Sequence, residues 1–203
     1  MDIAESFLMR LKLYYPSFTA IVVFLYTYFL GSLFIGGDQT HYRYVYEVVS
    51  QLNIFEAYIQ YKSRLYTDEL GHFVVIWIVS HFLEKDLFMA LSNAVLAFFS
   101  VKLFLSWGAR PIVAMFLVVF GYYYLSVYVS AERLKFGALF FVIGMYYFNA
   151  QNISFFRKSN LFFIISIVTH LQFFIILFAY ASKIVVTERL FKDFSISKIK
   201  LNF

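Results

Sequence analysis

The sequence predicts an all-α, polytopic integral membrane protein, and its composition and pattern of apolar runs support this fold class. Hydrophobic residues make up 62% of the chain and charged residues only 14%. A soluble domain has about 45–50% apolar and about 25% charged residues. The mean hydropathy of +0.75 points the same way. Largely apolar runs close to the roughly 20 residues that a helix needs to cross a bilayer recur along the chain.

These runs predict about six transmembrane or re-entrant helices. Five runs are long enough, or nearly so, to span a bilayer: 17–35, 87–107, 111–130, 134–150 and 161–182. The sixth run, 70–83, is short and carries two histidines. It is therefore either a tilted span or a re-entrant helix that is buried in protein.

The connections between the runs are short, with one exception. Residues 36–69 form a predicted external loop that is rich in tyrosine and aliphatic residues, so we expect it to fold. No internal repeat or linker is present, and residues 1–203 therefore read as a single transmembrane helical domain. The basic residues weakly favour a cytoplasmic N-terminus. With six crossings, this orientation places Asp38 outside and Arg133 inside.

Several classes of site are excluded. The chain has no cysteine, which excludes disulfides and thiolate metal sites. Its net charge of +5 suits loops beside anionic lipid headgroups. No nucleic-acid recognition motif, glycine-rich nucleotide loop, G-x-S-x-G elbow or H-E-x-x-H motif is present. We therefore expect a lipid bilayer as a partner, and neither nucleic acid nor a soluble cofactor.

The first candidate site follows the first apolar run, in the stretch GGDQTHYRYVYE at 36–47. Asp38, Tyr42 and Tyr46 are spaced so that a helix places them on one face, and Asp38 after two glycines is a good N-cap. One interpretation is a capped interfacial helix whose tyrosines belong to an aromatic belt. The other is a carboxylate beside aromatic rings on which sugars stack.

The second candidate lies in SAERLKFGALFF at 130–141. Arg133 and Lys135 stand where a predicted span begins, and they either anchor the helix to lipid phosphate or bind a substrate diphosphate. The guanidinium group presents a fixed fork to phosphate oxygens.

The third candidate is IVTHLQFF at 167–174, with His170 near the middle of the last predicted span and Gln172 close by. An ionisable residue at such depth is functional by default. His170 is either a general base for a hydroxyl or a neutral residue that is hydrogen-bonded to another helix.

Two acid-x-x-His pairs, Asp38 with His41 and Glu69 with His72, are the last candidates. Paired motifs of this form hold metals in some helix bundles, where further carboxylates complete the site. Such carboxylates are missing from the neighbouring predicted helices, so we expect no metal. We expect Glu69 instead to cap a helix or line the cavity.

Together these stretches resemble the Wzy/EpsG-type polysaccharide polymerases. The resemblance rests on Gly-x-Asp with following tyrosines, then Glu-Arg-Leu-Lys-Phe opening a helix, then His-Leu-Gln in a later helix, and it spans residues 36–172. The chain has Glu69-Leu70-Gly71 where the family often has Glu-Pro-Gly. Members of the family are usually longer. The chain is thus either a complete short enzyme or the N-terminal part of a longer polymerase.

The resemblance implies a multi-pass glycosyltransferase of the bacterial inner membrane. It would polymerise oligosaccharide units carried on undecaprenyl diphosphate into O-antigen or a similar surface polysaccharide, with a chain-length regulator protein as a further partner. By position, Asp38, Arg133 and His170 are the catalytic residues. The implied substrate-binding residues are Tyr42, Tyr46, Glu69, Lys135 and Gln172. Two alternatives stay open: a flippase or transporter of the same lipid-linked oligosaccharide, and a structural subunit of an envelope assembly.

Overall fold

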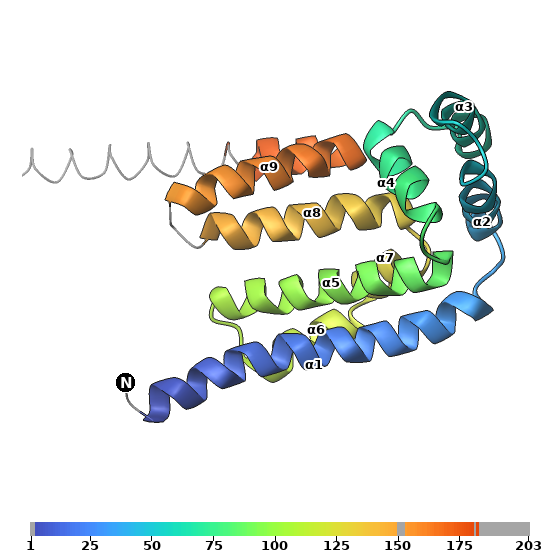
Figure 1. Ribbon diagram of the computed structural model, residues 1–203. Coiled ribbons are helices and arrows are strands. Elements are labelled where there is room, and N and C mark those ends of the chain that lie inside the picture. Colours follow the sequence, from blue (N-terminus) through green and yellow to red (C-terminus); the bar gives the residue numbers. More distant parts are fainter. Residues whose placement is uncertain (1–2, 150–152, 181, 183–203) are drawn as a thin grey trace, which may run out of the picture.

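The computed structural model describes residues 3–149, 153–180 and 182, and all the regular structure in this part of the chain is helical. The all-α prediction is therefore confirmed for these residues. Figure 1 shows α1, α5, α8 and α9 side by side in one row, with α6 and α7 behind and α2–α4 grouped at one end. The bounds are α1 Ile3–Leu33, α2 Asp38–Val49, α3 Ile54–Leu65, α4 Leu70–Ser80, α5 Lys85–Ser106, α6 Pro111–Phe120, α7 Tyr122–Val129, α8 Glu132–Asn149 and α9 Ile153–Thr169.

The predicted external loop folds into two of the three helices at that end, and we call α2, α3 and α4 the headpiece. The side chain of Asn53 caps α3 by accepting hydrogen bonds from the backbone N–H groups of Phe55 and Glu56. Tyr66 ends the same helix in the left-handed conformation, with φ of 50°. The headpiece is thus a folded unit with local start and stop signals.

The run 70–83 does not cross the bundle. It forms α4, an 11-residue helix that packs on α2, α3 and α9. Such a helix covers only about 16 Å, roughly half of a hydrocarbon core of roughly 30 Å. Helix α1 ends and α5 begins at the headpiece end of the row (Figure 1). The chain therefore leaves the headpiece, which includes α4, at the same end of the bundle at which it entered. Asp38 and Arg133 therefore lie at the same end of the bundle, contrary to the topology of six full crossings.

The prediction of a single span at 161–182 is also wrong, because the chain reverses direction at His170. Helix α9 runs antiparallel to α8, since the Ser166 hydroxyl donates to the carbonyl of Gly137 at 2.7 Å while Lys158 lies over the ring of Tyr147. Residues 172–180 are helical again and run parallel to α8: the ring of Phe173 lies 5.3 Å from Phe141, and that of Tyr180 lies 6.0 Å from Phe148. His170 stands at the tip of this hairpin, beside the headpiece.

Among the described residues, two helices are long and apolar enough to cross a membrane, namely the part Tyr14–Leu33 of α1 and the whole of α5. A third span results if α6 and α7 are counted together across a bend of 47°. The bend occurs at Gly121, where a Cβ atom would lie 2.3 Å from the carbonyl oxygen of Leu117. The six expected crossings are therefore met only in part, and the basic residues after position 182 lie outside the described residues.

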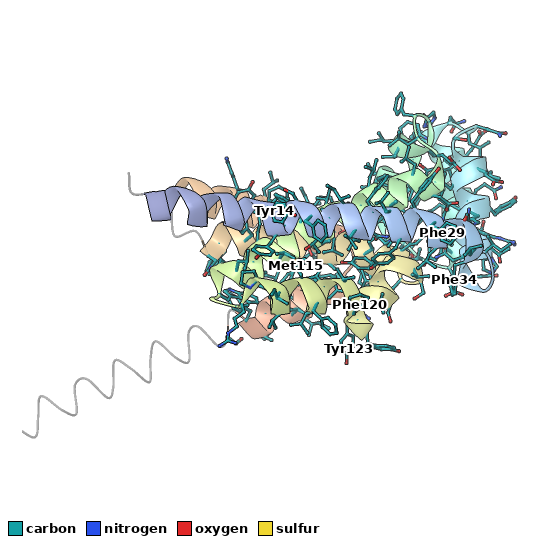
Figure 2. The ribbon with its side chains drawn as sticks, turned by 90° about the horizontal axis from the view of Figure 1, so that it is seen from below. Tyr14, Phe29, Phe34, Met115, Phe120 and Tyr123 are labelled. Atoms are coloured by element: carbon teal, nitrogen blue, oxygen red, sulfur yellow. The ribbon has the colours of Figure 1, made fainter. Side chains whose placement is uncertain are left out.

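Large apolar side chains cover the outside of these helices. Figure 2 shows this surface, on which Tyr14 and Phe29 mark α1, Met115 and Phe120 mark α6, and Tyr123 marks α7. Phe29 is 67% exposed and Tyr123 is 83% exposed. By contrast, small side chains such as Ala97 and Ala114 are fully buried where α5 meets its neighbours. An apolar exterior of this kind is unfavourable in water and suits a lipid environment.

Candidate functional site

Glu69 connects two of the predicted site residues at the headpiece end of the bundle. Its Oε1 atom is hydrogen-bonded to Nδ1 of His170, and its Oε2 atom lies 3.5 Å from Nη1 of Arg133. These residues are 101 and 64 positions from Glu69 in the sequence. Together with Tyr42, described below, we call Glu69, Arg133 and His170 the Glu69 cluster.

Local backbone features bring the members of the cluster together. Glu69 is the N-cap residue of α4, but its side chain makes no capping bond and extends instead to the other two residues. Arg133 stands in the first turn of α8, and His170 occupies the hairpin tip. Gly71 lets α4 touch this hairpin, because a Cβ atom on it would lie 2.7 Å from the backbone of Val168 and Thr169.

Tyr42 holds Arg133 from the other side. Nε of Arg133 donates a hydrogen bond to the Tyr42 hydroxyl oxygen at 3.0 Å. The Tyr42 ring meets the edge of His72, and Nδ1 of His72 is hydrogen-bonded to the hydroxyl of Tyr61 at 2.8 Å. Burial raises the pKa of the Tyr42 and Tyr61 phenols above its ordinary value, so both stay neutral. The guanidinium is thereby fixed by Tyr42 and Glu69, with a buried aromatic layer beneath it.

A cavity of about 170 Å³, here called the first cavity, opens beside Arg133. Tyr66 lines it with a ring that is 91% exposed, and it is therefore an accessible stacking surface. Two guanidinium groups also border the cavity, and this combination of charge and aromatic surface suits a ligand with both phosphate and sugar parts. The lining residues are Asp38, His41, Tyr42, Arg64, Leu65, Tyr66 and Arg133.

The structure places the remaining predicted residues as follows. Asp38 is exposed in the first turn of α2 and lines the first cavity, but Gly37 rather than Asp38 is the N-cap residue. Oε1 of Gln172 lies 3.0 Å from Nε2 of His170. Tyr46 is 5% exposed, and its hydroxyl donates to the carbonyl of Leu83 at 2.9 Å. Tyr46 therefore does not reach the first cavity.

Lys135 does not join Arg133. It is 1% exposed, and its Nζ atom donates to the carbonyl of Tyr128 at 3.1 Å. Residues two apart on a helix point to different sides, which explains why Lys135 enters the bundle while Arg133 faces the headpiece. The predicted role of Lys135 at a diphosphate beside Arg133 does not fit this position.

The two acid-x-x-His pairs separate in the same way. Asp38 and His41 line the first cavity. Glu69 belongs to the Glu69 cluster, whereas His72 is buried against Tyr61. Within the part of the chain that the structure describes, no group of three or more histidine, aspartate or glutamate residues is arranged to hold a metal ion.

Sequence reasoning did not find three features of this region. Tyr66 gave no signal, because nothing in its neighbours indicates a positive φ. Tyr61 is one of the 17 tyrosines of the chain, and its spacing did not distinguish it from the others. Lys85 lies in the short predicted connection between the runs 70–83 and 87–107, where a lysine is expected to be exposed. In the structure it forms a buried ion pair with Glu132 and donates to the side chain of Gln39 at 2.9 Å. This pair fixes the start of α8, where Arg133 follows.

Comparison of the chain with protein-family models, with curated proteins and with solved structures finds no match. The contacts described above are therefore the basis for assigning a function.

Proposed function

We propose that this protein is a membrane glycosyltransferase that joins lipid-diphosphate-linked oligosaccharide units into a bacterial surface polysaccharide such as O-antigen. The observation that carries the proposal is the bridging position of Glu69, which contacts a histidine and an arginine at one end of a bundle of apolar helices. A base for a hydroxyl and a cation for a diphosphate are the two groups that this transfer requires. The resemblance to Wzy/EpsG-type polymerases implies the same reaction.

His170 is the proposed general base. A carboxylate on Nδ1 fixes the tautomer of an imidazole and leaves Nε2 to accept a proton. In this chain Glu69 accepts a hydrogen bond from Nδ1, and Nε2 lies 3.0 Å from Oε1 of Gln172. Because an amide oxygen is also an acceptor, a neutral Nε2 requires the Gln172 amide to be turned over, with its NH2 group toward the imidazole. The acceptor hydroxyl would displace that amide and give its proton to Nε2 as its oxygen forms the new bond to the anomeric carbon of the donor.

Arg133 is the proposed group that stabilises the departing diphosphate. As the glycosyl bond to the diphosphate oxygen breaks, negative charge accumulates on that oxygen, and a fixed guanidinium offsets it without giving up a proton. Tyr42 and Glu69 hold Arg133 in place, and Arg64 borders the same cavity. The exposed ring of Tyr66 offers a stacking surface for a sugar, the role that the sequence had suggested for Tyr42 and Tyr46.

The apolar helices place this site at a bilayer surface in the proposal. Helices α1 and α5 would hold the chain in the bacterial inner membrane as a multi-pass protein, and the lipid tails of both substrates would stay in the surrounding bilayer. A chain-length regulator protein remains a predicted partner.

The test is polymerisation by the purified protein in detergent micelles. Lipid-linked repeat units from the source strain are the only substrate, and the products are resolved by size on a gel. A polymerase lengthens the glycan in micelles, whereas a flippase leaves its length unchanged because micelles have no two sides to exchange.

Three variants sharpen the assay. His170→Ala and Arg133→Ala should lose lengthening, while Glu56→Gln, an exposed change on α3 away from the cluster, should retain it. Single-length products from the wild-type protein, with donor and acceptor both present, would refute the proposal.

A further inference from the structure

A second cavity of about 340 Å³ lies against another part of α2. Glu47, Ser50 and Gln51 border it from α2 and the turn that follows, Ser80 borders it from the end of α4, and Glu84 borders it from the start of α5. A pocket that holds a small ligand has a volume of about 300–1,000 Å³. The second cavity therefore has room for a sugar ring, and its lining is polar although the chain as a whole is apolar.

The charges around this cavity are of two kinds. Arg43 is paired with Asp86 at 2.7 Å, and Lys85 is paired with Glu132, so the two cations are already neutralised. Glu47 and Glu84 are exposed and have no side-chain hydrogen bond or ion pair to any residue that the structure describes. Free carboxylates repel phosphate and accept hydrogen bonds from hydroxyl groups.

A smaller chamber of about 20 Å³ lies on the bundle side of Arg43, Lys85 and Asp86, which line both it and the second cavity. Three buried atoms in the chamber lining have no hydrogen-bond partner: Oε2 of Glu132, Oδ1 of Asn93 and Nε of Arg43. Glu132 and Asn93 are each only 2% exposed. Two acceptors and one donor match a single water molecule, which needs about 10–15 Å³ and two to four polar partners. The chamber thus has the room and the polar partners for one water molecule next to the second cavity.

We infer that the second cavity is a saccharide subsite, which binds an uncharged sugar unit of the lipid-linked substrate away from the reacting bond. The inference rests on the proposed function and adds to it the position of a further sugar. Helix α2 supplies both cavities, since Asp38 and Tyr42 line the first while Glu47 and Ser50 line the second. In this proposal, a glycan whose reacting end lies at Arg133 extends around α2 to reach the second cavity.

The test uses the full chain in detergent and the variants Glu47→Gln, Glu84→Gln and their combination. The probe is the repeat-unit oligosaccharide freed from its lipid diphosphate by mild acid, and its Kd is measured by calorimetry. Each single variant should weaken binding about tenfold and the combination about a hundredfold, because one charge-assisted hydrogen bond per carboxylate is lost. Glu56→Gln is the matched control, since Glu56 is also an exposed glutamate at the start of a helix.

Turnover separates a subsite from a structural effect. In the polymerisation assay, the double variant should raise KM for the lipid-linked unit and leave kcat unchanged, because the subsite holds substrate and transition state equally. Unchanged Kd and KM in a double variant that unfolds at the wild-type temperature would overturn the subsite. Wild-type protein that binds the probe but does not lengthen glycan would instead overturn the proposed function and leave the subsite in place.

Discussion

Replacing Gly71 with alanine tests whether the headpiece holds His170 in position. The new Cβ atom would lie 2.7 Å from the backbone of Val168 and Thr169, which immediately precede the histidine. Ordinary contacts begin near 3.4 Å, so α4 and the hairpin tip must separate by about 0.7 Å. Backbone atoms in packed helices cannot turn aside as a flexible side chain does. The separation therefore falls on the hydrogen bond between Glu69 and His170.

The expected magnitudes follow from this displacement. Overpacking costs about 1–3 kcal/mol, and alanine regains about 0.5–1 kcal/mol over glycine within a helix. The net loss is about 0–2.5 kcal/mol, or up to about 10 °C in Tm for a chain of this length. The rate of glycan lengthening should fall strongly even where Tm changes little, since a shift of about 1 Å in a catalytic group lowers the reaction rate about 100-fold.

The assay compares Gly71→Ala with Gly36→Ala, in which the added Cβ atom meets nothing within 4 Å. Both proteins are purified in the same detergent, and their Tm and rate of glycan lengthening are measured. Gly36→Ala should match the wild type in both. If Gly71→Ala also keeps wild-type Tm and rate, the contact between α4 and the hairpin does not position His170.

Further predictions concern the cluster, the metal, the topology and the buried ion pair. Arg133→Lys keeps the charge but loses both the fork and the Nε donor, so polymer length at matched protein level should fall at least about tenfold; wild-type length would contradict a diphosphate role. Polymerisation should survive EDTA, and activity that is lost and then restored by one divalent ion would refute this. The native chain has no cysteine, so single cysteines can be introduced and labelled without background. Cysteines at Asp38 and Tyr66 should react with an impermeant maleimide from one side of sealed vesicles, and a cysteine at exposed Arg110 only from the other side. Labelling of positions 38 and 66 from opposite sides would contradict the proposed site. Lys85→Met leaves its buried carboxylate partner uncompensated, so unfolding in denaturant should show a loss of about 3–5 kcal/mol, and an unchanged midpoint would show that the pair is dispensable.

The helical class and most helix positions could be predicted from the sequence, because apolar runs of suitable length are a strong local signal. The reversal at His170 could not. The run 161–182 contains no glycine or proline to mark a turn. The hairpin depends instead on distant contacts, since Gly137 and Gly144 of α8 give space to Phe173 and Phe163 of its two arms.

The candidate site was predictable in its residue types more than in its arrangement. Asp38, Arg133 and His170 stood out because charges are rare in an apolar chain. Their partners depend on the tertiary fold, since Glu69 meets His170 only through the hairpin. Lys135 turns away from Arg133 because residues two apart on α8 point to different sides, and its partner, the carbonyl of Tyr128, is likewise set by the fold. The tyrosines on α2 illustrate the limit, since their spacing predicted one shared face but not that both rings would be buried.

The bridging position of Glu69 has a consequence for the order of biosynthesis. Its two partners lie 64 and 101 residues further along the chain, so a ribosome must complete α8 and then the α9 hairpin before the cluster can form. A nascent chain inserted as far as α7 carries the carboxylate and the tyrosines but neither the guanidinium nor the imidazole. The Glu69 cluster therefore cannot form in a nascent chain that ends before the α9 hairpin.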